Sequence, residues 1–142
     1  MLLARVPKAR ILKRQADEFF VGLKAGRPEW SPDPARRGAV FSNPGKCYRS
    51  SISYRPALKR YLWVQIRPGA ASRFHGGIGI YDGPEPWGPW TTAFYTEYFD
   101  VGPGENAHLP RKWTRRDGQV MYLVSSTDDQ LCVRRVDLTL AP

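Results

Sequence analysis

The segment YDGPEPWGPW, residues 81–90, contains three prolines, two glycines and two tryptophans within ten residues. Proline and glycine at this density favour a turn over the interior of a strand or helix. The segment overlaps one strand-like run, GIGIYD at 77–82, and leads into another, TTAFYTEYF at 91–99. We therefore interpret it as the turn between two antiparallel strands, with Trp87 and Trp90 packed inside the fold. The alternative interpretation is a loop that presents both tryptophans to a sugar.

The pattern of this segment occurs earlier in the chain. GLKAGRPEW at 22–30 and GIYDGPEPW at 79–87 share Gly, an aliphatic residue, Gly and Trp without a gap. A second pair, YRPALKRYLWV at 54–64 and WTRRDGQVMYL at 113–123, shares an aromatic residue, a turn and a hydrophobic run. The two pairs have nearly the same offset, which indicates a structural unit that repeats every 58 residues or so.

Each repeat contains strand signals in the same order. An alternating or apolar run bounded by turn residues predicts a strand, and an Asp-Gly pair at 117–118 predicts a hairpin. The predicted strands are LLARV at 2–6, a strand near 18–23, SSISY before a proline-containing turn, RYLWVQI at 60–66, the two strands beside YDGPEPWGPW, QVMYLVS at 119–125 and LCVRRVDLTL at 131–140.

We therefore predict an all-β fold, a partial β-propeller of two to three four-stranded antiparallel blades. The chain is expected to form one domain, with blade parts at about 1–43, 47–100 and 108–142. The repeat places Tyr54 and Trp113 at equivalent positions on inner strands, and Leu62 and Met121 at equivalent core positions on second strands. Trp63 and Tyr122 are expected to point the same way in their blades, and Trp87 and Trp90 to pack between blades.

Composition and missing motifs argue against several other classes of protein. The chain has 142 residues and a net charge of +9, with fourteen Lys and Arg against four Asp and Glu in residues 1–60. No apolar run reaches the 18 or so residues of a membrane-spanning helix, and the start of the chain lacks the cleavage site of a signal peptide. No cofactor or metal is predicted, because nucleotide-binding and zinc-protease motifs are missing. We expect Cys47 and Cys132 to be two buried thiols, with a single disulfide as the alternative.

Three segments resemble the C-terminal part of bacterial five-bladed glycosidase-like β-propellers, a group that includes arabinan-degrading furanosidases. They are IGIYDGPEPWGPWTTAFYTE, CYRSSISYRPALKRYLWVQ and KWTRRDGQVMYLVSS with the following CVRRVDLTL. The resemblance extends from about Leu3 to Leu140. Members of the family that it resembles are often secreted. It implies a propeller related to glycoside hydrolysis, which needs two carboxylates on either side of one bond. It also implies that the blades supplying the catalytic base and a second acid lie outside this sequence.

A ligand of a propeller binds near the axis, so residues of the inner strands are the candidate binding residues. Arg49 would bind sugar hydroxyls or a carboxylate through its planar guanidinium, unless it forms an ion pair inside its blade. His108 and His75 are acid–base candidates or ordinary surface histidines. The inner-strand candidates are Tyr48, Arg49 and Ser50 in one repeat, and His108, Arg111 and Lys112 in the next.

By the same resemblance, Glu18 is the candidate general acid, because it begins a strand of a middle blade. The following phenylalanines, Phe19 and Phe20, would give it the apolar surroundings that such an acid needs. Asp17 is the alternative, and a plain surface acid is the competing interpretation. Glu29 and Glu85 occupy nearly matching repeat positions and are interpreted as structural turn residues.

Three functions remain open from the sequence. The first is a glycoside-hydrolase-like segment acting on a polysaccharide, catalytically incomplete unless self-association of two copies closes the ring. The second is a carbohydrate-binding or structural module without catalysis. The third is binding of an anionic polymer through the basic N-terminal half. The sequence does not favour nucleic acid as that polymer, because it contains no recognition module.

Overall fold

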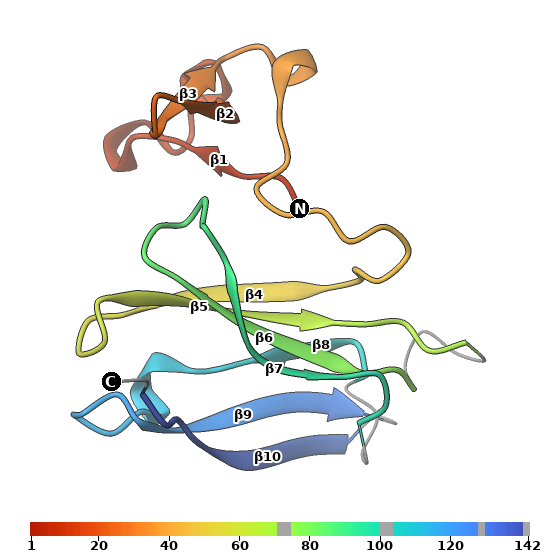
Figure 1. Cartoon of the computed structure of the whole chain (residues 1–142). Helices are drawn as coiled ribbons and strands as arrows, with labels where there is room; N and C mark the ends of the chain where they lie inside the picture. The colour runs from red at the N-terminus through yellow and green to blue at the C-terminus, as the bar shows by residue number, and fades with distance from the viewer. Residues whose placement is uncertain (71–74, 100–103, 128–129, 141–142) are drawn as a thin grey trace. The chain divides into compact units, whose positions relative to one another are not determined.

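The computed structural model describes residues 1–70, 75–99, 104–127 and 130–140 (Figure 1). Every regular element in this part of the chain is a β-strand or a three-residue 3₁₀ helix, and the strands form three separate antiparallel sheets. The chain divides into two compact units, Met1–Ser42 with Pro86–Gly88, and Asn43–Glu85 with Pro89–Pro142. The protein is therefore all-β, as the sequence predicts.

The first unit contains a three-stranded sheet in the order β1-β2-β3. Ala25 and Gly26, both with positive φ, form the two-residue turn between β2 and β3, a conformation that matches the twist of a hairpin. The elements are β1 (Ala4–Arg5), η1 (Lys8–Arg10), η2 (Arg14–Ala16), β2 (Glu18–Lys24), β3 (Arg27–Ser31) and η3 (Pro34–Arg36).

Trp30 is the centre of the packing in the first unit. Its ring meets Phe20 edge-on at 5.8 Å between centroids and Trp87 at 6.2 Å. The guanidinium of Arg5 lies over the same ring, 4.2 Å from its centroid. Trp87 is thus used for packing, which agrees with the structural interpretation of YDGPEPWGPW.

The second unit begins with a four-stranded sheet in the order β4-β5-β6-β7. The segment YDGPEPWGPW connects β6 to its antiparallel neighbour β7, as predicted. Trp90 packs against Trp63 at 5.3 Å between ring centroids, on the sheet formed by these strands. The strands are β4 (Ser50–Arg55), β5 (Arg60–Ile66), β6 (Ile78–Gly83) and β7 (Thr91–Thr96).

A three-stranded sheet completes the second unit, in the order β10-β9-β8. The Asp-Gly turn precedes β9: Gly118 has a φ of 77°, and Asp117 Oδ1 accepts a hydrogen bond from the Gln119 amide at 2.9 Å. The Asp-Gly signal therefore marks a turn, as predicted. The elements are β8 (Asn106–His108), η4 (Arg111–Trp113), β9 (Val120–Thr127) and β10 (Gln130–Asp137).

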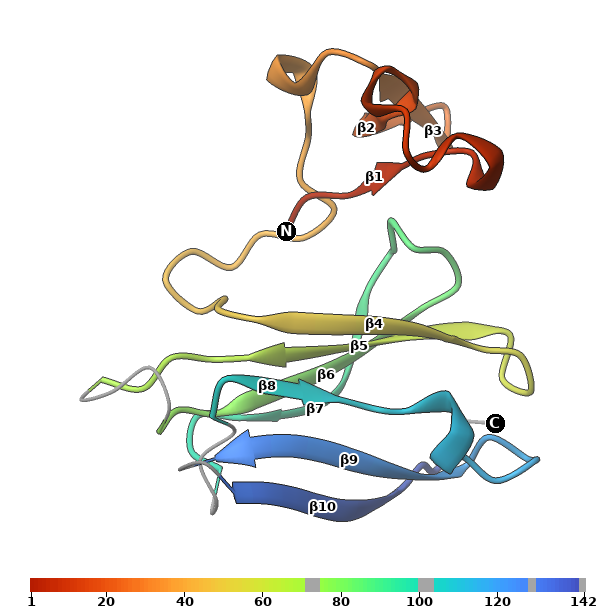
Figure 2. The same ribbon diagram turned by 180° about the vertical axis from the view of Figure 1, so that it is seen from behind.

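The two sheets of the second unit pack face to face (Figure 2). A buried apolar cluster with residues from both sheets lies between them. Ser51 Oγ also donates a hydrogen bond to the Ala107 carbonyl at 2.9 Å, which joins β4 to β8. The cluster consists of Leu62, Val64, Ile66, Ile78, Ala107, Leu109, Met121 and Leu123. Leu62 and Met121 thus occupy the core positions that the repeat predicts.

Side chains one residue further along, Trp63 and Tyr122, point to the face opposite the cluster because side chains alternate along a strand. The two side chains therefore lie on the outer faces of two facing sheets and point in opposite directions, so the prediction that they point the same way in their blades is wrong. Their environments also differ: Trp63 is 2% exposed and Tyr122 is 39% exposed. Trp90 contacts Trp63. The prediction that Trp113 lies on a strand is wrong, because it is the last residue of the 3₁₀ helix η4.

The cysteines are free, and no disulfide joins them. Cys132 is half-buried in β10, whereas Cys47 is exposed in the loop before β4. The prediction of two buried thiols is therefore wrong, because Cys47 lies in an exposed loop and Cys132 lies on a strand whose residues alternate between exposed and half-buried.

Candidate functional site

The predicted inner-strand residues Tyr48 and Arg49 meet a carboxylate that the sequence reasoning did not select. Arg49 forms an ion pair with Glu105 Oε2, and the Tyr48 hydroxyl lies 3.4 Å from the same oxygen. The Arg49 guanidinium also approaches the Tyr48 ring, at 5.3 Å from its centroid. Arg49 thus makes the intramolecular ion pair that was the alternative to ligand binding.

The sequence repeat could have identified Glu105 as a neighbour of the candidate site. It is separated from Tyr48 by 57 residues, the offset of the first repeat match, so the repeat places both residues ahead of an inner strand. Its neighbours in GPGENAHLP are those of an ordinary polar loop, so the local sequence does not mark Glu105 as a site residue.

The other inner-strand candidates lie at different places along β4, β8 and η4. Ser50 is the half-buried first residue of β4. His108 ends β8 and is exposed, on the face opposite the buried Ala107. Arg111 and Lys112 lie beyond Pro110, in η4. Strand β8 therefore separates Glu105 at one end from the basic residues at the other, and the predicted residues do not form a single site.

The candidate acid Glu18 lies at the start of β2 in the first unit. Its Oε2 accepts a hydrogen bond from Arg5 Nε at 2.8 Å, and both side chains are partly exposed. These are the surroundings of a paired carboxylate and differ from the apolar contact with phenylalanine that the sequence suggested. Asp17, the alternative acid, is half-buried beside it in the chain. The catalytic role of Glu18 stays a prediction.

Glu29 and Glu85 differ in the structure. Glu29 lies in β3 opposite Gly22 and faces Lys24 Nζ at 3.8 Å, so it is a strand residue. Glu85 is exposed in the turn between β6 and β7, as the sequence interpretation requires. The turn interpretation therefore holds for Glu85 and is wrong for Glu29, because the β2–β3 turn is shorter and ends before that residue.

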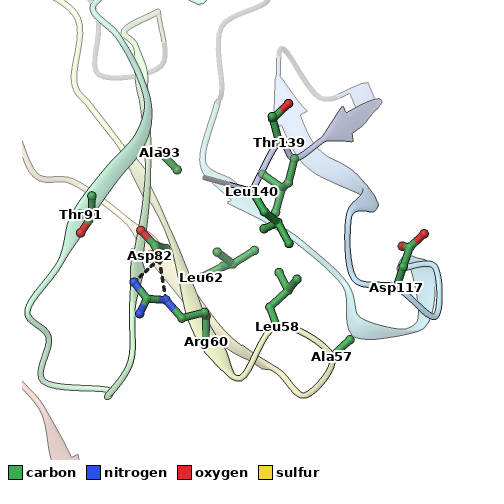
Figure 3. A pocket seen from close by; sticks show the side chains of 11 residues that line it. Ala57, Leu58, Arg60, Leu62, Asp82, Thr91, Ala93, Asp117, Thr139 and Leu140 are labelled. Atoms are coloured by element: carbon green, nitrogen blue, oxygen red, sulfur yellow. Dashed lines mark hydrogen bonds and ion pairs between the residues drawn. The ribbon is translucent and has the colours of Figure 1, made fainter. Parts of the chain in front are cut away.

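The second unit contains a cavity of about 600 Å³ between its two sheets (Figure 3). Leu58, Leu62 and Leu140 give it an apolar lining. To one side Arg60 and Asp82 form an ion pair, with Arg60 Nε 2.7 Å from Asp82 Oδ2. The cavity thus combines an apolar surface with one planar, charged pair, the composition typical of a small-molecule site.

A second cavity, of about 560 Å³, shares lining residues with the first. Ala93 of β7 and Leu138 and Thr139 after β10 line both cavities, so the two are neighbours along these outer strands, and we refer to them together as the groove. Phe94 and Phe99 add aromatic surface to the second part of this groove.

The carboxylates that line the groove already have partners. Asp82 is paired with Arg60, Asp117 accepts from the Gln119 amide, and Asp137 Oδ1 lies 2.7 Å from Arg135 Nη2. Glycoside hydrolysis requires one carboxyl group to give a proton while another attacks or activates water. Each of the three carboxylates that the structure describes in the lining of the groove is therefore held by a partner within the protein.

The described ranges contain no group of three or more His, Cys, Asp and Glu that could hold a metal ion. None of the helices in the described part of the chain is long and apolar enough to cross a membrane. No protein-family profile, no curated protein and no solved structure matches the chain. The class that the fold defines is an all-β protein of three antiparallel sheets.

Proposed function

We propose that the chain is a carbohydrate-binding module, part of a glycosidase-like β-propeller, that does not catalyse hydrolysis by itself. The observation that carries the proposal is the groove between β7 and β10, with its apolar lining and the Arg60–Asp82 pair at one side. A sugar ring has an apolar face and a rim of hydroxyls. The apolar lining of the groove would contact the face, and the charged pair would form hydrogen bonds with the hydroxyls.

The arrangement of the sheets supports the propeller part of the proposal. Three antiparallel sheets follow one another along the chain, and within each sheet the strands are neighbours in sequence order. Successive up-and-down sheets of up to four strands are the building units of a propeller. The face-to-face packing of the two sheets in the second unit is the contact that neighbouring blades make.

Titration with a panel of furanoside and pyranoside polymers tests the proposal. Ala93 lines both parts of the groove, so Ala93→Trp is expected to fill it and abolish binding. Thr92→Trp is the matched control, because Thr92 is an exposed neighbour on the same strand that lines neither cavity. Binding that is lost in the first variant and kept in the second supports the proposal. Failure of the unchanged protein to bind any of the polymers would overturn it.

A further inference from the structure

A third cavity, of about 220 Å³, differs from the groove in its charge. It lies where the turn between β4 and β5 meets η4 and the Asp-Gly turn, and both views place these three segments at the same end of the second unit (Figure 1, Figure 2). Four arginines line it, together with Thr114 and Gly118: Arg55, Arg111, Arg115 and Arg116.

Arg55 is a fixed part of this cavity. Its side chain is only 2% exposed, although it ends strand β4. Nη1 donates to Thr114 Oγ1 at 2.7 Å and Nη2 donates to the Leu109 carbonyl, while the buried Nε has no partner. A guanidinium has five N–H donors, so Arg55 is held in place by two bonds and keeps other donors free.

Within the part of the chain that the structure describes, no acidic side chain is paired with the arginines of this cavity, which are Arg55, Arg111, Arg115 and Arg116. Asp117, adjacent in sequence, is bound to a backbone amide and lines the other cavity. Burial, and next the charge of Arg111, lower the pKa of Arg55 from its ordinary value. Like charges that line one cavity repel, and a bound anion would relieve this repulsion.

We propose that this arginine cavity is a binding site for a tetrahedral oxyanion, the phosphate or sulfate group of a ligand. A guanidinium presents paired donors that match two oxygens of such a group, and several arginines can bind its oxygens from different sides. The cavity is also much larger than the roughly 30 Å³ that one water molecule occupies in the liquid. The arginine cavity differs in charge from the groove proposed to bind carbohydrate, although Ala57 lines both.

The test is titration of the full chain with inorganic phosphate and, in a separate arm, with sulfate, each at constant ionic strength. The expected result is saturable binding that shifts the Arg55 Nε–H resonance and raises the melting temperature by mass action. The double variant Arg115→Gln with Arg116→Gln should lose about tenfold or more in affinity, since each exposed arginine supplies charge-assisted hydrogen bonds. A preference for one anion identifies which ester the site serves.

The control removes the same charge elsewhere. Arg10 and Arg14 are exposed arginines at η1 and η2 of the first unit, and their double replacement by Gln should leave the affinity within about twofold. Equal losses in both double variants would mean non-specific attraction to a basic protein and would overturn the proposal. So would the lack of saturable binding of either anion, or saturation by acetate alone.

Discussion

Leu62 is a buried residue at the core position that the sequence repeat predicts. It is 3% exposed and belongs to the apolar cluster between the two sheets of the second unit. Leu62→Ala should lower the free energy of unfolding by about 2–5 kcal/mol, because it removes buried apolar contacts and leaves a cavity. Chemical denaturation followed by circular dichroism measures this change.

The matched control is Leu131→Ala, at a position on β10 that is 72% exposed. Truncation of an exposed leucine should change the free energy of unfolding by no more than about 0.5 kcal/mol. Similar effects for the two substitutions would show that Leu62 does not lie in a packed core, and the interface between the sheets would have to be placed elsewhere.

The second prediction for a single residue concerns the ion pair of Glu97. Its carboxylate lies 2.9 Å from Nη1 of Arg67, whose side chain is 2% exposed, and accepts a hydrogen bond from the Tyr95 hydroxyl at 3.0 Å. These bonds, the one from Arg67 first, lower the pKa of Glu97 from its ordinary value. Its ion pair therefore stabilises the fold above the ordinary glutamate pKa of about 4.3 and ceases to do so as the pH falls through the lowered pKa.

Glu97→Gln should accordingly lower the melting temperature near neutral pH, and the gap to the unchanged protein should close in acid. Thermal melts across this pH range measure the gap. Glu85→Gln, at an exposed acid of the β6–β7 turn, is the control and should change little at any pH. A gap for Glu97→Gln that stays constant with pH would mean that the ion pair is not its cause.

At the scale of elements, hydrophobic periodicity was sufficient to locate most strands. RYLWVQI becomes β5, in which positions 62–66 are all buried, and LCVRRVDLTL becomes β10, in which exposure alternates. The misplacement of Trp113 has a local cause. Pro110 follows β8 closely, and the Trp113 amide donates to its carbonyl at 3.1 Å, so the chain turns where β4 continues as a strand.

The next prediction concerns Trp87, in the β6–β7 turn formed by the segment YDGPEPWGPW. Trp87 packs edge-on against Trp30, so Trp87→Ala should lower the free energy of unfolding by about 1–3 kcal/mol and leave carbohydrate binding in the groove unchanged. Trp113→Ala is the control, because Trp113 is 46% exposed. Calorimetry beside a polymer titration separates the outcomes. Loss of binding at unchanged stability would mean that the turn is a sugar platform.

At the scale of the whole molecule, the sequence predicted the class of fold and the succession of strands but only part of each site. It selected Arg49 and Arg111 but neither Glu105 nor Arg55, their neighbours in space. The reason is physical: ion pairs and cavities arise where strands distant in sequence approach one another, such as β4 and β8. The repeat relates equivalent residues of different sheets, and contains no information about the distance between their side chains.

The last prediction concerns activity. The candidate acid Glu18 is held by Arg5, and the carboxylates of the groove are bound to arginines or to a backbone amide. Positioned acid catalysis alone contributes only about 10²–10⁴-fold, which is far below the acceleration that an enzyme needs on a very slow reaction. We therefore expect the purified monomer to release no reducing ends from arabinan or related polysaccharides above background. Turnover that is lost in Glu18→Gln would contradict this and make Glu18 the acid. Turnover that survives the substitution would also contradict it, and would place the catalytic carboxylates elsewhere in the chain.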